Sequence, residues 1–191
     1  MAKYFLIAGL VFSMGFLTVA RAEQWTLVKE ESFIRFSGFQ IGRPFEGEFE
    51  DFSASICFEE DNLAAASISL VIDMESATTG ILERDEILKA PEWMDSAGYP
   101  TATFRITAIE RLGPDSYQGN GFLEMKGVSR EVTLPFILNL VDNTASGSLT
   151  IDRRDFDIGE GRWGETEQWV GFEIEINFTV TAIPTGAACE K

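Results

Sequence analysis

The chain has 191 residues, which is enough for one ordinary domain with a hydrophobic core. Its 31 acidic and 15 basic residues give a formal net charge of −16, and such a surface repels nucleic acid and anionic lipid headgroups. The sequence contains no histidine, so it lacks the commonest general base, the commonest zinc ligand and every histidine-dependent catalytic triad. We therefore expect no nucleic-acid partner, no metal site and no cofactor of the protein's own.

The first 22 residues have the organisation of a secretory signal peptide. A basic Lys3 precedes the apolar run 4–19, and the small residues Ala20 and Ala22 form a cleavage site. The run is shorter than the roughly 20 residues that a membrane-spanning helix needs, and an uncleaved anchor is the alternative. We expect cleavage after Ala22, export from the cytoplasm, and one domain over residues 23–191.

The rest of the chain alternates apolar and polar residues, which is typical of strands with one dry and one wet face. In residues 170–183 every second residue is apolar, and Glu173 and Glu175 fall on the wet face. The other strand predictions, in chain order, cover residues 24–30, 31–42, 43–60, 65–75, 101–112, 117–127, 130–140 and 146–156. Turns that contain glycine separate several of them.

One segment breaks the alternation. Residues 78–100 have helical spacing in Ile81, Leu82, Ile87 and Leu88, and Pro91 ends the run. We expect a short helix and loop inserted between two strands of one domain.

About eight antiparallel strands fit either a sandwich or a closed barrel. The inward faces are rich in Phe, Ile, Leu and Met, which suits a packed core as well as a tunnel for an apolar ligand. Trp93, Trp163 and Trp169 fall in or next to loops, where they either pack the ends of the barrel or form an apolar lip that touches a membrane.

The two cysteines, Cys57 and Cys189, lie in the mature part of the chain and would meet an oxidising compartment after export. Cys57 faces outward on its strand, and Cys189 follows Pro184 and Gly186 in a tail that can reach over. A disulfide, two free thiols and an intermolecular link through the tail all remain open.

Several motifs resemble, in order and spacing, those of the YceI family. They are "FEGEFEDFSASICF", "TTGILERDEILKAPEWMDSAGYPTATF", "GFLEMKGVSREVTLPF" and "LTIDRRDFDIG". The resemblance covers about residues 24–182, and it implies an all-β fold: an eight-stranded antiparallel lipocalin-like barrel with one short helical insertion. It further implies a periplasmic protein that holds a long-chain isoprenoid or quinone-like lipid in its lumen.

From the resemblance and the alternation we expect sixteen apolar side chains to line the lumen and contact the lipid tail. They are Phe36, Ile56, Phe58, Ile68, Leu70, Ile72, Phe104, Ile106, Leu123, Met125, Leu134, Phe136, Phe172, Ile174, Ile176 and Phe178. Some of them can instead belong to solid core, and the sequence does not divide the two groups.

Two arginines are candidates for a polar headgroup. Arg84, beside Asp85, lies on the insertion, and Arg154 lies in the pair Arg153-Arg154, where a guanidinium suits a phosphate. The simpler interpretation of both is a structural ion pair or a capping contact.

Three functions follow from this sequence. We expect a lipid carrier without catalytic residues, in at most transient contact with a membrane, and a homodimer stays open. A packed, ligand-free structural barrel is the first alternative. A carboxylate enzyme acting on an apolar substrate is the second, and it would need acidic groups inside the lumen.

Overall fold

A computed structural model describes residues 22–189 of the chain. Residues 1–21, which make up nearly all of the predicted signal peptide, lie outside the described residues. The described part contains strands β1 (Glu23–Leu27), β2 (Phe33–Gln40), β3 (Arg43–Phe49), β4 (Phe52–Phe58), β5 (Ser67–Asp73), β6 (Ala77–Thr78), β7 (Thr101–Arg111), β8 (Ser116–Met125), β9 (Val128–Asn139), β10 (Thr144–Asp152) and β11 (Glu173–Ala188), and helix α1 (Leu82–Lys89). Short 3-10 turns occupy Lys29–Glu31, Leu63–Ala65, Met74–Ser76, Arg153–Phe156 and Gly161–Trp163.

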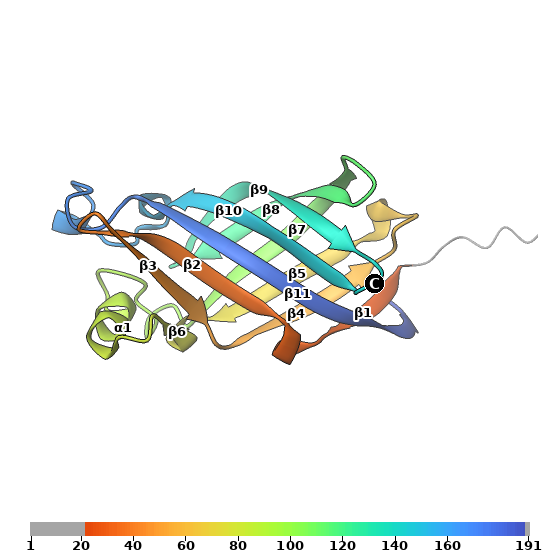
Figure 1. Cartoon of the computed structure of the whole chain (residues 1–191), viewed down its shortest axis with the longest axis horizontal. Coiled ribbons are helices and arrows are strands. Elements are labelled where there is room, and N and C mark those ends of the chain that lie inside the picture. The colour runs from red at the N-terminus through yellow and green to blue at the C-terminus, as the bar shows by residue number, and fades with distance from the viewer. Residues whose placement is uncertain (1–21, 190–191) are drawn as a thin grey trace, which may run out of the picture.

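The strands form the wall of a closed antiparallel barrel (Figure 1). The wall has eight ribbons, each of which runs once along the barrel. Three of them are interrupted and consist of two strands each: β1 with β2, β3 with β4, and β5 with β6. Each ribbon pairs with the next one along the chain, and β11 returns to pair with both β2 and β1. The predicted eight-stranded antiparallel barrel with one short helical insertion is confirmed.

The interruptions in the first two ribbons lie side by side and are fastened together. The ammonium group of Lys29 lies 2.6 Å from a carboxylate oxygen of Asp51, and it also lies over the ring of Phe52. The hydrogen bond and charge of Lys29 lower the pKa of the Asp51 carboxyl below its ordinary value. This contact joins two neighbouring bends of the wall.

Tight turns join two of the strand pairs. Ile41 and Gly42 connect β2 to β3, and Lys126 and Gly127 connect β8 to β9; all four have positive φ. Two consecutive residues with positive φ define the mirror-image turn whose twist matches that of a hairpin, and glycine is favoured at its second position.

Strand β11 shows the predicted alternation. Ile174, Ile176 and Phe178 face the interior of the barrel, while Glu173 and Glu175 are exposed. One edge of β11 pairs with β10 and the other with β2 and β1, so its inward residues are enclosed from both sides.

The two ends of the barrel are built differently. Helix α1 lies beside β3 and β6 at one end, which also carries the long segment between β10 and β11 (Figure 1). The C-terminus lies at the other end, where the short turn between β9 and β10 is found. In the part of the chain that the structure describes, no helix has both the length and the apolar character to span a membrane.

A disulfide joins Cys57, near the end of β4, to Cys189, directly after β11. Their Cα atoms lie 6.0 Å apart, and the residues are separated by 132 positions in sequence. Strand β1 runs between the two strands: Gln24 pairs with Cys57, and the backbone N–H of Cys189 donates to the carbonyl oxygen of Ala22. The disulfide therefore fastens the wall across β1, where the barrel closes.

We predict that replacing both cysteines by serine lowers the free energy of unfolding by about 3–5 kcal/mol. The reason is that a cross-link over so long a loop restricts the unfolded chain. Denaturant unfolding of the oxidised protein, the reduced protein and the double variant measures the difference. Reduced protein should match the variant, and a reductant should leave the variant unchanged; equal stability of the oxidised and reduced protein would contradict the prediction.

Candidate functional site: an apolar cavity along the barrel

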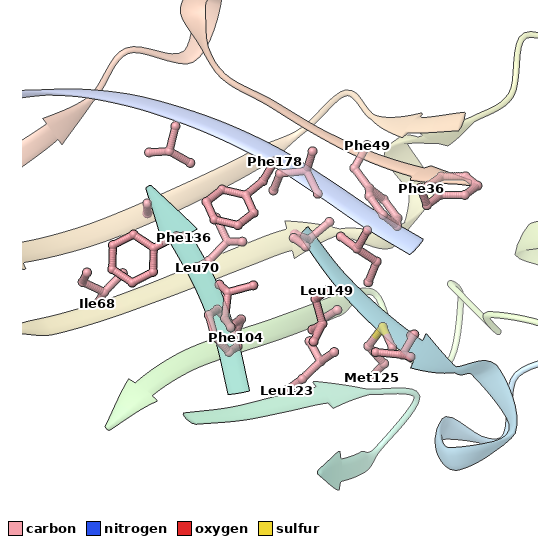
Figure 2. A pocket seen from close by; sticks show the side chains of 18 of the residues that line it. Phe36, Phe49, Ile68, Leu70, Phe104, Leu123, Met125, Phe136, Leu149 and Phe178 are labelled. Atoms are coloured by element: carbon pink, nitrogen blue, oxygen red, sulfur yellow. The ribbon is translucent and has the colours of Figure 1, made fainter. Parts of the chain in front are cut away.

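An elongated cavity of about 240 Å³ runs inside the barrel (Figure 2). Its lining reaches from Trp25 and Asn143 near one end to Trp93 and Arg153 at the other. All lining residues are apolar except Asn143 and Arg153. The described interior of the barrel is therefore hollow, and its wall is almost entirely hydrocarbon.

Fifteen of the sixteen side chains predicted to face the lumen line this cavity. They are Phe36, Ile56, Phe58, Ile68, Leu70, Ile72, Phe104, Ile106, Leu123, Met125, Leu134, Phe136, Ile174, Ile176 and Phe178. Several of them, such as Phe36, Leu123 and Met125, also belong to the packed core, so wall and core are one layer of side chains. That these side chains contact a lipid stays a prediction.

The prediction for Phe172 was wrong, because this residue does not line the cavity. It lies just before β11 begins, outside the regular strand, although Val170, two residues earlier, does line the cavity. The centre of its ring lies 3.6 Å from the guanidinium carbon of Arg154 and 5.4 Å from that of Arg153.

The alternation also missed lining residues that come from outside the regular strands. Leu88, Trp93 and Met94 come from the helical insertion, and Ile158 comes from the segment between β10 and β11. Irregular segments have no period of two, so the pattern that marks a strand's inner face carries no information there.

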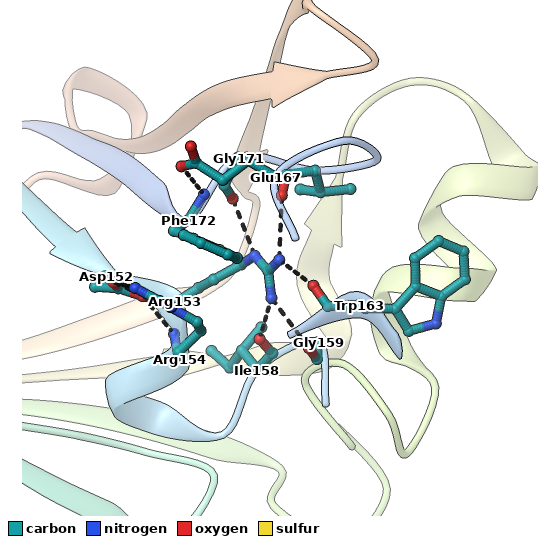
Figure 3. Close-up of polar contacts among 10 residues, drawn as sticks. Asp152, Arg153, Arg154, Ile158, Gly159, Trp163, Glu167, Gly171 and Phe172 are labelled. Atoms are coloured by element: carbon teal, nitrogen blue, oxygen red, sulfur yellow. Dashed lines mark hydrogen bonds and ion pairs between the residues drawn. The ribbon is translucent and has the colours of Figure 1, made fainter. Parts of the chain in front are cut away.

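The segment 157–172 forms a cap over one end of the cavity, and Arg153 holds it (Figure 3). The side chain of Arg153 is 1% exposed, and its guanidinium donates five hydrogen bonds, all to backbone carbonyl oxygens. The acceptors, at 2.5–3.1 Å, belong to Ile158, Gly159, Trp163, Val170 and Gly171. Every N–H of this fork is used, which is what a buried guanidinium requires.

The electrostatic environment of Arg153 is unusual for an arginine. Burial lowers the pKa of its guanidinium from the ordinary value, and the charges of Asp152 and Glu167 oppose this shift. A β-carbon at Gly159 would lie 2.4 Å from Arg153 Nη1, so the close approach at this position favours glycine, which also has positive φ here.

Further hydrogen bonds attach the cap to the barrel, among them those from the N–H of Ile41 to the carbonyl oxygen of Trp169 and from the N–H of Gly171 to that of Phe39, each at 2.9 Å. The backbone N–H groups of Gly159 and Glu160 donate to the carbonyl oxygen of Glu92 in the insertion, each at 2.9 Å. The ammonium group of Lys126, in the β8–β9 turn, donates to the carbonyl oxygen of Asp157 at 2.7 Å. The cap thus joins segments that are far apart in sequence: the β2–β3 hairpin, the insertion, the β8–β9 turn and the turn that carries Arg153.

Three tryptophans lie at the capped end. The ring centres of Trp93 and Trp163 are 5.9 Å apart, and those of Trp163 and Trp169 are 6.4 Å apart. Trp93 is buried and lines the cavity, whereas Trp169 is 45% exposed. The sequence left two roles open for the tryptophans, packing of the barrel end and an apolar lip that touches a membrane. Trp93 packs the barrel end.

Neither arginine predicted to meet a headgroup lines the cavity. Arg154 donates hydrogen bonds to the carboxylate of Asp152 and stacks on Phe172 outside the lumen. Arg84 lies over the ring of Phe45, 5.6 Å from its centre. Adjacent positions in a turn or helix point in different directions, so Arg153, and not Arg154, faces inward.

The neighbour of Arg84, Asp85, fastens helix α1 to the barrel. Its carboxylate accepts hydrogen bonds from the hydroxyl groups of Thr78 and Thr79 and from the backbone N–H of Thr79, at 2.6–2.8 Å. Burial raises the pKa of Asp85, but these hydrogen bonds outweigh it, and the net pKa lies below its ordinary value. The pair Arg84-Asp85 is therefore better explained as a contact that ties the insertion to the barrel than as a binding site for a headgroup.

A closed antiparallel barrel with a hollow apolar interior defines a lipocalin-like binding barrel. The chain belongs to the YceI family, since the model of the YceI-like domain matches residues 25–182. The family resemblance inferred from the sequence motifs is confirmed.

Known relatives agree with this assignment. Protein YceI of Salmonella arizonae is 32% identical over 133 residues, which cover 68% of this chain and 68% of that protein. The crystal structure of BcnA from Burkholderia cenocepacia is similar with a TM-score of 0.76 and 30% identity, over 81% of this chain and 98% of that one. A polyisoprenoid binding domain from Saccharophagus degradans shares the fold with a TM-score of 0.62 and 17% identity, over 85% of this chain and 99% of that one.

We predict that Arg153→Met destabilises the protein by about 3 kcal/mol or more, because five buried or partly buried carbonyl groups lose their donor. The matched variant Arg154→Met should cost far less, because the Arg154 side chain is 46% exposed and an ion pair in water contributes little. Denaturant unfolding compares the two variants, and hydrogen exchange should increase across residues 157–172 in the Arg153 variant only. Equal losses in the two variants would show that Arg153 does not hold the cap.

We also predict that Asp85 makes stability depend on acid pH. Its folded-state pKa lies below the unfolded value of about 3.9, so its stabilising contribution is complete above that pH and is lost as the pH falls through the folded pKa. Asp85→Asn should be less stable than the native chain at pH 7 and should lose less stability between pH 7 and pH 3. Unfolding at a series of pH values tests this, with Glu83→Gln on the exposed side of α1 as the control. If the native chain and Asp85→Asn lost stability in parallel as the pH fell, the prediction would be wrong.

Proposed function

We propose that this protein binds and carries a long-chain isoprenoid, a quinone-like lipid or a similar amphiphile in its barrel, without covalent chemistry. The observation that carries the proposal is the elongated cavity with its almost wholly apolar lining. Each CH₂ group taken out of water contributes about 0.8 kcal/mol, so a chain of a few prenyl units is held by apolar area alone. A hydrocarbon wall of this kind suits a long, flexible tail better than a compact polar metabolite.

The relatives support the chemical class of the ligand. The domain from Saccharophagus degradans is named as polyisoprenoid binding, and it shares the barrel fold. For this chain the ligand class rests on that likeness together with the lining of its own cavity.

The two alternatives derived from the sequence find less support. A packed structural barrel would have side chains meeting across the interior, whereas the described interior is hollow. A carboxylate enzyme would need acidic groups in the lumen, and among the described residues the cavity lining contains none. Glu173 and Glu175 are exposed on the outer face of β11.

We further propose that the carrier works in the periplasm after removal of residues 1–22. The leader-like sequence and the pairing of Cys57 with Cys189 support export, because disulfides persist in oxidising compartments. We expect contact with membranes to be at most transient, because anionic headgroups repel the acidic surface.

The direct test is to purify the protein from the export compartment without detergent and to analyse its organic extract by mass spectrometry. A lipid with a prenyl chain should be recovered in stoichiometric amount. If no lipid is recovered, and added isoprenoids do not raise the melting temperature, the carrier proposal is wrong.

We predict that Ala54→Trp weakens lipid binding at least tenfold, because a large side chain then occupies the lumen. Ala54 lines the cavity, while the next residue, Ser55, is exposed on the outer face of the same strand. Ser55→Trp adds the same side chain to the outside and should bind lipid as the native protein does. Displacement of a fluorescent lipid measures both affinities after circular dichroism has shown that both variants are folded; equal affinities would place the ligand elsewhere.

A further inference from the structure

The capped end of the cavity contains a buried hydrogen-bond donor without an acceptor. Trp93 is 7% exposed and lines the cavity, and its Nε1–H is fully buried. Within residues 22–189, no atom accepts a hydrogen bond from it. An unsatisfied buried donor destabilises the protein, so it points to an acceptor that a bound molecule brings.

The surroundings of the Trp93 ring show which part of the indole meets the cap. A β-carbon at Gly159 would lie 3.0 Å from Trp93 Cζ3, so that corner of the indole faces the cap. Nε1 lies on the opposite side of the indole, on the edge that points away from Gly159. The rings of Trp93 and Trp163 are in contact, with centres 5.9 Å apart.

The neighbouring cation favours an oxygen atom at this place. The guanidinium carbon of Arg153 lies 5.3 Å from the centre of the Trp93 ring, and in the described part of the chain no carboxylate forms an ion pair with Arg153. The positive charge attracts the negative end of a ligand dipole. However, all five N–H groups of Arg153 already donate to backbone carbonyls, so the free donor belongs to Trp93.

We propose that the capped end is the subsite for the polar end of the lipid, where Trp93 Nε1–H donates to a neutral carbonyl or hydroxyl oxygen. This inference rests on the proposed lipid-binding function. A phosphate fits less well, because its charge would have to be desolvated at a closed end while the arginine donors stay bound to the cap. The apolar tail then extends along the lumen toward Asn143.

The test compares lipids that share one C20 chain and differ only in the polar group. Geranylgeraniol carries a hydroxyl, geranylgeranyl phosphate carries a phosphate, and the corresponding hydrocarbon carries no acceptor. Each is titrated against the native protein, Trp93→Phe, which removes the donor but keeps an aromatic ring, and Trp163→Phe, which changes a ring that does not line the cavity.

We expect Trp93→Phe to weaken binding of the alcohol roughly 5- to 10-fold and to leave binding of the hydrocarbon unchanged. Trp163→Phe should affect the two lipids equally. An equal loss for alcohol and hydrocarbon in Trp93→Phe, or no loss for either, would overturn the subsite. A larger loss for the phosphate than for the alcohol would overturn the assignment to a neutral oxygen, and failure of the native protein to bind any of the three would instead overturn the proposed function.

Discussion

The structure depends on the closure of one sheet by strand β11. This strand pairs with β10 along one edge and with β2 and β1 along the other, so the first ribbon of the chain is joined to the last. Closure removes the free edges that an open sheet would expose and sends every second side chain of each ribbon into one enclosed volume. The disulfide across β1 lies at the same seam, where the two ends of the described chain meet.

A closed barrel of eight strands can be filled by its own side chains or can hold a guest, and side-chain size decides between the two. Here the lumen keeps an elongated void although its wall includes large residues such as Phe104, Phe136 and Phe178. An apolar void forgoes the dispersion contacts that packing would give, so the empty state is less stable than a filled one. A lipid tail would restore these contacts, and it requires no polar groups in the wall.

The sequence predicted the wall well because the wall obeys a simple rule. A period of two fixes which side of a strand is enclosed, and this was enough to place residues such as Ile68, Leu123 and Ile176 on the cavity. The rule fails where the strand ends, as Phe172 shows. It also cannot separate Arg153 from Arg154, because both belong to a 3-10 turn in which neither residue type nor spacing distinguishes the buried side chain from the exposed one. The acceptors of Arg153 are carbonyl groups up to 18 positions away, which no local pattern reveals.

This division between wall and ends has a consequence for selectivity. A hydrocarbon wall distinguishes guests by length and width, and a single methylene group is worth only about 1 kcal/mol. Discrimination between lipids that share a tail therefore has to come from polar groups, and the described lining has these only at its two ends, in Trp25 and Asn143 and at the cap with Arg153 and Trp93. Both ends are built from turns and insertions, which can change without disturbing the pairing of the strands. One barrel can thus keep the same lumen while its ends determine which lipid it holds.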